Sequence, residues 1–183
     1  MNQYLPAILA TLGTCAVLAL LILLGWRHRL RRQGDVASPV APPTELSAPW
    51  VTVPGQYVST TTAGDWLDRI AVHGLGYKAN ATLTVHPEGL LYARDGAPDV
   101  YVPAAALVGA RRESGMAGKF VERDGLIVIE WTLGDHAVDT GFRPRFSDDS
   151  TAAIAAVDMI LAARTSSSPG TDDIHPAQKK DTK

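Results

Sequence analysis

The sequence has few of the residues that build disulfide, metal or nucleophilic sites. Its only cysteine is Cys15, which excludes an internal disulfide framework. The five histidines show no His-x-x-x-His spacing and no cysteine partner, so their spacing gives no support for zinc. The chain also lacks a Gly-x-Ser-x-Gly elbow, the turn that presents a serine nucleophile. We therefore predict a protein that is not an enzyme and has no metal, no cofactor and no catalytic residue.

The sequence also lacks an excess of positive charge. Its formal net charge is −2, from 17 Lys+Arg against 19 Asp+Glu. Four of the arginines cluster within residues 27–32. Without those four, 13 basic residues face the same 19 acidic ones, a balance of −6 from residue 35 onward. Because nucleic-acid binders carry a basic footprint, this balance predicts no nucleic-acid partner.

Charged side chains are absent from the first 26 residues, and this absence predicts a membrane span. The segment from Tyr4 to Trp26 would make a helix of roughly 35 Å, longer than a hydrocarbon core of about 30 Å. A cleaved signal peptide is one alternative, but it expects a basic start and a shorter apolar run. The "LGTC" ending at Cys15 suggests a lipoprotein as another alternative, which Thr14 and the continuing apolar run disfavour.

Basic residues directly after the span predict its orientation. Arg27, Arg29, Arg31 and Arg32 all lie on its C-terminal side, and Lys and Arg close to the end of a span stay in the cytoplasm. We therefore predict a single-pass protein of the plasma membrane, with the N-terminus outside and the main domain in the cytoplasm. The arginine run could also attract anionic lipid heads, although a role in topology alone would explain it.

The rest of the sequence divides into a linker, one domain and a tail, after a span over residues 4–26. Residues 27–49 are first basic and then rich in proline, and "SPVAPPTELSAP" is typical of a semi-extended spacer. Residues 165–183 are polar and lack periodicity, which predicts a disordered tail. The foldable domain therefore covers residues 50–164, enough for one modest hydrophobic core.

Short alternating segments separated by turns predict a mainly β domain. In "ATLTVHPEGLLYAR", Leu83 and Val85 alternate with polar residues, and "HPEG" then favours a turn. In "GLIVIEWTLGDHAVDTGF", Ile127, Ile129 and Trp131 would share one face of a strand. The segments "QYVSTTT", "WLDRIAV", "DVYVP" and "GKFVE" bring the total to about seven antiparallel strands.

The last foldable segment, "DDSTAAIAAVDMILAAR", changes to helical periodicity. It begins with Asp149 or Ser150 as the N-cap. Its apolar residues at helical spacing are Ile154, Val157, Ile160 and Leu161. Antiparallel strands followed by one amphipathic helix is the order of a pleckstrin-homology-like (PH-like) fold, in which the helix closes one end. The predicted fold class is therefore mainly β with one C-terminal helix: a PH-like antiparallel β-barrel or sandwich preceded by one transmembrane α-helix.

Three segments also resemble a known family. "HGLGYKANATLTVHPEGLLYAR", "VYVPAAALVGARRESGMAGKFV" and "GLIVIEWTLGDHAVDTGFRP", in this order behind one N-terminal span, are similar to actinobacterial single-span membrane proteins with a bacterial PH-like domain. The resemblance covers about residues 4 to 164 and includes the step from Val102-Pro103 into "ALVGAR". It implies a PH-like fold and a membrane location, in a family often described as export or transport-associated, and it supplies no catalytic residues.

Two local patterns look like ligand sites but lack the required context. Residues 74–79 spell G-x-G-x-x-A, yet the strand-like "ATLTV" follows where a dinucleotide site requires a helix. Asp135, His136 and Asp139 come closest to a metal-binding group. On a strand, however, His136 would point away from both carboxylates. Neither pattern predicts a site.

One surface patch remains as a candidate binding site. "GARRESGMAGKFVER" places Arg111, Arg112, Lys119 and Arg123 around a glycine-rich connection in an otherwise acidic domain. This patch could bind an anionic lipid or an acidic protein partner. The alternative is a solvated surface on which two neighbouring glutamates partly cancel the charge.

The sequence leaves two functions open. The first is a non-enzymatic interaction module that is anchored in the membrane, faces the cytoplasm and docks a protein partner or an anionic lipid. The second is an accessory subunit of a membrane transport or export system, in which the span contacts other helices. Because no charged residue lies within the span, we do not expect it to conduct a solute alone.

Overall fold

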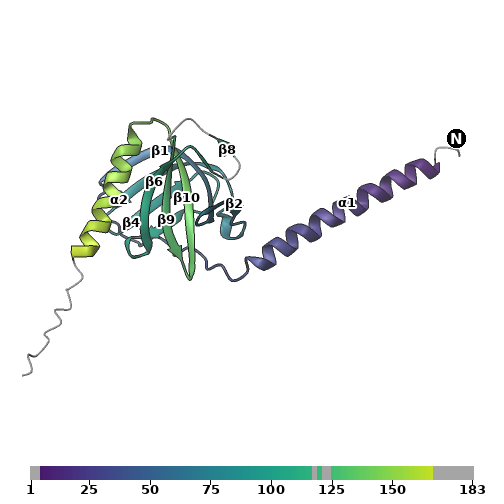
Figure 1. Cartoon of the computed structure of the whole chain (residues 1–183), viewed down its shortest axis with the longest axis horizontal. Coiled ribbons are helices and arrows are strands. Elements are labelled where there is room, and N and C mark those ends of the chain that lie inside the picture. Colours follow the sequence, from purple (N-terminus) through teal and green to yellow (C-terminus); the bar gives the residue numbers. More distant parts are fainter. Residues whose placement is uncertain (1–4, 117–118, 121–124, 167–183) are drawn as a thin grey trace, which may run out of the picture.

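The computed structural model describes residues 5–116, 119–120 and 125–166 (Figure 1). A long N-terminal helix, α1 (Leu5–Arg32), extends away from a barrel-like β domain. A second helix, α2 (Asp149–Ser166), lies on the side of that domain opposite α1. The predicted fold class is confirmed: the chain is mainly β, with one apolar helix before the sheet and one helix after it.

The main sheet is antiparallel and has eight strands. They are β1 (Val51–Thr62), β2 (Asp65–Arg69), β3 (Ala79–His86), β4 (Gly89–Arg94), β5 (Val100–Pro103), β6 (Leu107–Glu113), β9 (Leu126–Leu133) and β10 (His136–Pro144). Their order is β5-β4-β3-β1-β10-β9-β6, with β2 paired to β1. The short strands β7 (Gly115–Met116) and β8 (Lys119–Phe120) form a separate pair, and the 3-10 turns are η2 (Val72–Gly74) and η3 (Ala104–Ala106).

Strand β1 is long enough to join the two halves of this sheet. Its first part, through Tyr57, pairs with β3, and its second part, from Gly55 onward, pairs with β10. The register of the β10 pairing shifts between Tyr57 and Ser59, which is the signature of a β-bulge. Bulges bend a strand and increase its twist, so this one helps β1 to curve the sheet around its core.

Three strands differ from those that the sequence predicts. Arg111 and Arg112 lie in β6 rather than in a connection, because β6 pairs with β9 from Leu107 to Glu113. The glycine and charges of "LVGARRE" hide the alternation that would have marked this edge strand. The predicted strand "WLDRIAV" is also shorter than expected: β2 ends at Arg69, and its pairing with β1 is interrupted. Of "GKFVE", the strand β8 covers two residues, and the rest lies outside the described part of the chain.

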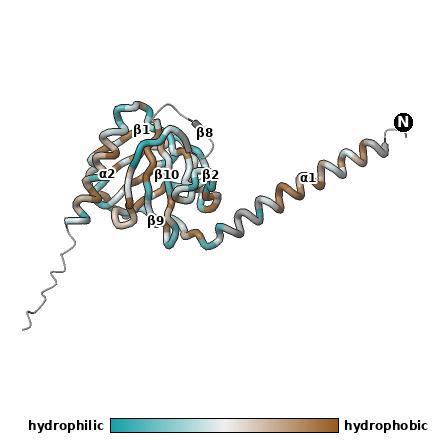
Figure 2. The backbone as a smooth tube through the Cα atoms, viewed as in Figure 1, coloured by the Kyte–Doolittle hydropathy of each residue, from teal (hydrophilic) through white to brown (hydrophobic). Residues whose placement is uncertain are grey.

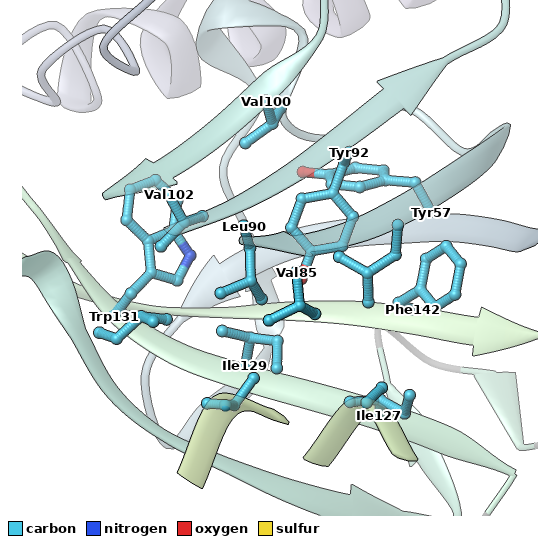
Figure 3. Close-up of a cluster of buried hydrophobic side chains, with 14 of the residues drawn as sticks. Tyr57, Val85, Leu90, Tyr92, Val100, Val102, Ile127, Ile129, Trp131 and Phe142 are labelled. Atoms are coloured by element: carbon cyan, nitrogen blue, oxygen red, sulfur yellow. The ribbon is translucent and has the colours of Figure 1, made fainter. Parts of the chain in front are cut away.

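The core fills the space that the strands enclose (Figure 3). Ile127, Ile129 and Trp131 all point into it from β9, as the alternation predicts. Tyr92 packs edge-on against Tyr57, with ring centres 5.6 Å apart, and lies 5.9 Å from the ring of Phe142. Aromatic pairs at these separations add to the stabilisation that burial alone provides.

Helix α2 closes one end of the sheet through its apolar face. The residues buried on it are Ser150, Ala153, Ala156, Val157 and Ile160, and the predicted Ile154 and Leu161 are partly buried against the same core. Near its end, the Arg164 side chain donates to the carbonyl oxygens of Ala104 and Leu107, at 3.0 and 2.6 Å. The helix is thereby fixed to the turn between β5 and β6.

Helix α1 is long and apolar enough to cross a membrane. Its most apolar window, Ile8–Gly25, has a mean hydropathy of 2.5, and none of it is buried against the rest of the protein. Figure 2 shows the apolar residues along the middle of this helix. The helix continues beyond Trp26 to Arg32, because the arginine run has no helix breaker before Gly34.

The first residues after α1 pack on the β domain. We call residues 33–37 the strap. The Gln33 amide donates to the Arg69 carbonyl at 3.0 Å and accepts from the Ala71 N–H at 2.7 Å. Val36 is buried in the main core, and its carbonyl lies 2.8 Å from Nε2 of His73. Part of the segment predicted as a spacer is therefore held against the domain.

Candidate functional site

The structure places the predicted basic residues in different environments. Arg111, on β6, faces three carboxylates. Its guanidinium donates to both oxygens of Asp139, at 2.6 and 3.2 Å. It also lies 3.1 Å from Glu113 and 3.6 Å from Glu130. The hydrogen bonds from Arg111 to Asp139, more than the charges, raise the arginine pKa above its usual value.

The pairing of Arg111 with Asp139 gives this arginine a structural role. Asp139 is only 4% exposed, so its carboxylate depends on the guanidinium and on the Gly64 N–H, 3.3 Å away, in place of water. An arginine that already faces three carboxylates has little positive potential left for an anionic ligand. Arg111 is therefore poorly available for an anionic ligand.

The other predicted patch residues are less constrained or lie beyond what the structure describes. Arg112 is exposed on β6 and donates to the Thr151 hydroxyl at the start of α2. Lys119 lies in β8, and Arg123 lies outside the described residues. Binding of a partner or lipid by these residues stays a prediction. The membrane-proximal arginines Arg27, Arg29, Arg31 and Arg32 lie in the last two turns of α1.

An open groove of about 880 Å³ forms where β1, β3 and the end of β10 meet the start of α2. Its lining includes Gly55 and Gln56 of β1 and Asn80 of β3. The segment that joins β10 to α2 supplies much of the remaining wall, together with Asp95 after β4 and Gly125 before β9. The Arg145 N–H in this segment donates to the Pro54 carbonyl at 2.9 Å. The groove therefore runs across two strand pairs and has a rigid floor.

The groove presents charges of both signs together with one exposed aromatic ring. Arg143 and Arg145 contribute two positive charges, and Asp95 and Asp148 contribute two negative ones. The Phe146 side chain is 60% exposed, and the Arg145 guanidinium lies 5.8 Å from the centre of its ring. Such a surface suits recognition of a polypeptide, which can supply apolar contacts and both signs of charge.

Sequence reasoning missed this groove because its residues are far apart in the chain. The available signal was "FRPRF" at residues 142–146, where two arginines and an aromatic residue follow the last strand. This signal is weak, because single apolar side chains on a protein surface are normal. The signal gives no indication that Gln56 and Asn80 lie beside it.

A buried polar cluster surrounds Tyr57 and Thr60 of β1 and has a structural role. The Tyr57 hydroxyl donates to the Leu75 carbonyl at 3.0 Å and lies 2.6 Å from the Thr60 hydroxyl. The Arg94 guanidinium lies 4.5 Å from the centre of the Tyr57 ring and donates to the Gly74 carbonyl at 2.8 Å. Burial raises the pKa of Tyr57 to about 12, against the hydrogen bond from Thr60 and the charge of Arg94. This cluster ties the loop before β3 to the end of β4.

Within the residues that the structure describes, no group of three His, Cys, Asp or Glu side chains could hold a metal ion. Asp139 faces Arg111, as described above, while His136 lies 3.5 Å from Asp35. The glycine-rich segment from Gly74 leads from η2 into β3 rather than into a helix. The Asp139 and His136 side chains thus have structural partners, and the glycine-rich segment lacks the helix that a dinucleotide site requires.

The strand order, the closing C-terminal helix and the open groove define the class of this domain. It is a PH-like domain, and such domains are generally non-catalytic interaction modules. The chain belongs to the bacterial PH domain-like family, whose model matches residues 36–158. The matched region begins in the strap and ends within α2.

Two solved structures resemble the chain at low identity. A chain of the 8S snRNP assembly intermediate has 11% identity and a TM-score of 0.43, over 81% of this chain and 98% of that one. A structure of Vav1 inhibited by an allosteric inhibitor has 11% identity and a TM-score of 0.39, over 68% of this chain and 30% of that one. A comparison with curated proteins gave no match.

Proposed function

We propose that this protein is a membrane-anchored, non-enzymatic interaction module. In this proposal α1 crosses the plasma membrane with its N-terminus outside, and the PH-like domain docks a protein partner in the cytoplasm. The observation that carries the proposal is the complete exposure of the apolar window Ile8–Gly25 beside a folded domain. An apolar helix of this length without a protein partner needs a lipid environment.

The groove supports a protein partner rather than an anionic lipid. Its two arginines are offset by two aspartates, whereas a site for phosphate groups concentrates positive charge. The domain as a whole has ten basic against fourteen acidic residues from 51 to 164, which disfavours general adhesion to an anionic surface. An exposed phenylalanine beside paired charges is better suited to a peptide segment.

The orientation of the span gives the first prediction. Alkaline phosphatase fused after Lys183 should be inactive in bacterial cells, and a fluorescent reporter at the same position should be active, because the arginines retain the domain in the cytoplasm. The control variant replaces Arg27, Arg29, Arg31 and Arg32 with alanine and should show mixed orientation. Phosphatase activity in the unmodified chain would reverse the proposed topology.

The groove gives the second prediction. In a pulldown from detergent extracts, the variant R143E/R145E should retain its fold but recover its partner about tenfold less well, because reversed charges repel a complementary surface. The matched control is K78E, which reverses an exposed basic residue that lies outside both the groove and the predicted basic patch. Equal recovery by both variants would exclude the groove as the docking surface.

The same pulldown separates the interaction module from an accessory subunit of a transport or export system. A partner that docks on the domain should be recovered by residues 33–183 as well as by the full chain. A transport partner that contacts the span should be lost when α1 is removed. Recovery that needs α1 and is insensitive to the groove variant would favour the accessory subunit.

A further inference from the structure

The strap fixes one end of the β domain to the end of α1. Gln33 directly follows the last helical residue, and its side-chain amide forms two hydrogen bonds with the segment after β2. Burial of Val36 and the contact of its carbonyl with His73 hold the strap at a second point. On the other side, Asp35 faces His136, the first residue of β10. The strap therefore holds the domain close to the end of α1 and is not a flexible linker.

The length of α1 beyond its apolar window sets how far this end of the domain can be from the lipid. Gln33 lies eight positions after Gly25, which corresponds to about 12 Å of helix. The headgroup region of a bilayer occupies roughly 5 to 8 Å on each side of the hydrocarbon. The strap would therefore lie within a few ångströms of the headgroups when α1 spans the membrane.

The part of the domain beside the strap is the hairpin of β1 and β2. Figure 1 shows β2 on the side of the barrel that faces α1. The Arg69 carbonyl that accepts from Gln33 is at the end of β2. Arg69 and Asp65 pair with the adjacent residues Thr61 and Thr62 of β1, so residues 66–68 bulge out of the ladder between them. This bulge therefore lies beside the strap, on the side of the domain that faces α1.

Two large apolar residues are exposed at the start of β2. Trp66 is 45% exposed and Leu67 is 60% exposed, in a strand that buries none of its side chains fully. The Asp65 carboxylate accepts the backbone N–H groups of Leu67 and Asp68, at 3.1 and 3.2 Å, which fixes the conformation of the tip. Tryptophan and leucine on a rigid, exposed tip are typical of residues that enter a membrane interface.

We propose that the β2 hairpin is a second membrane contact, with Trp66 and Leu67 inserted among the lipid headgroups. This proposal rests on the proposed function, in which α1 spans the bilayer. The contact would fix the orientation of the domain, so that α2, on the opposite side of the barrel, faces away from the membrane (Figure 1).

The chemistry of the tip makes this contact apolar rather than electrostatic. Asp65 and Asp68 flank the two apolar residues, and Asp68 accepts the Thr62 hydroxyl at 2.7 Å. Two carboxylates would be repelled by an anionic lipid surface. Insertion should therefore occur equally well in a bilayer of neutral lipids, and salt should not weaken it.

Fluorescence quenching in reconstituted vesicles tests the contact with the full chain. An environment-sensitive dye is attached to Cys15 in the unmodified chain, and to Leu67→Cys or Met159→Cys in a Cys15→Ser background. Met159, on α2, is 51% exposed and serves as the matched control on the far side of the domain. The vesicles are phosphatidylcholine, with quenchers attached either near the headgroup or deep in the acyl chains.

The three labels separate this inference from the proposed function. We expect the Cys15 dye to lose fluorescence with the deep quencher, the Leu67→Cys dye to lose it with the shallow quencher, and the Met159→Cys dye to be unaffected. Quenching at Cys15 without quenching at Leu67→Cys would overturn the hairpin contact and leave the span intact. No quenching at Cys15 would overturn the span and the contact with it. Quenching at Leu67→Cys that requires anionic lipid or low salt would also overturn the apolar contact.

Discussion

Trp131→Ala is expected to lower the free energy of unfolding of the β domain by about 3 to 5 kcal/mol. The Trp131 side chain is 1% exposed and lies in the core between the strand partners Leu107 and Val138. Its indole N–H donates to the Thr140 hydroxyl at 2.8 Å. The alanine variant would leave a cavity at a position where strands on both sides restrict collapse. Urea unfolding of the full chain in detergent would measure the loss.

The matched control for this prediction is Trp50→Ala, because Trp50 is 45% exposed at the start of β1. Trp50→Ala should lower the free energy of unfolding by less than about 1 kcal/mol, as is usual for exposed positions. The loss of stability in Trp131→Phe should be intermediate, because the phenylalanine ring fills much of the space of the indole. In that variant the Thr140 hydroxyl still has the Thr60 hydroxyl as a hydrogen-bond partner. A loss below 1 kcal/mol for Trp131→Ala would mean that the ring does not support the core.

The burial of Trp131 shows which parts of this fold could be predicted from the sequence. Alternation along β9 is a local property, and the turns before and after it are marked by Gly125 and Gly134. Because successive side chains on a strand point to opposite faces, the burial of Ile127, Ile129 and Trp131 on one face follows directly. The helical periodicity of α2 identifies its buried face in the same way.

Sequence reasoning did not anticipate the pairing of Arg111. This arginine and Asp139 are 28 residues apart, on β6 and β10, which are joined in space only through β9 between them. The sequence places Arg111 near other basic residues, whereas the sheet places it near three carboxylates. For Arg111, closeness to basic residues in the sequence therefore did not indicate its surroundings in the fold.

The groove was beyond prediction for a related reason. Most of its walls come from β1, β3 and the segment after β10, which meet because β1 pairs with both β3 and β10. Gly55 is where these pairings overlap: its partner on β3 is Ala81, and its partner on β10 is Pro144. From the sequence alone, Gly55 is one of several glycines in a strand-like segment with no evident role.

Gly55→Ala is expected to destabilise the domain by about 3 kcal/mol, near the upper end for overpacking. A methyl group at this position would overlap the backbone carbonyl oxygen of Arg143 and would approach the Phe142 ring to 2.7 Å. The carbonyl belongs to the paired strand β10 and the ring is buried in the core, so neither can move without loss of contacts. The pairing of β1 with β10, and with it the floor of the groove, should be displaced.

Gly109→Ala provides the control for this prediction, because Gly109 is also in a strand and, among the described residues beyond its chain neighbours, no atom lies within 4 Å of the added methyl group. That variant should be neutral or slightly more stable, since alanine restricts the unfolded chain. Thermal unfolding measures the stability of both glycine variants. The pulldown that is used for R143E/R145E measures whether each glycine variant still binds the partner. If Gly55→Ala unfolded like the unmodified chain and bound its partner normally, the close approach of β1 and β10 at this point would not be needed for either property.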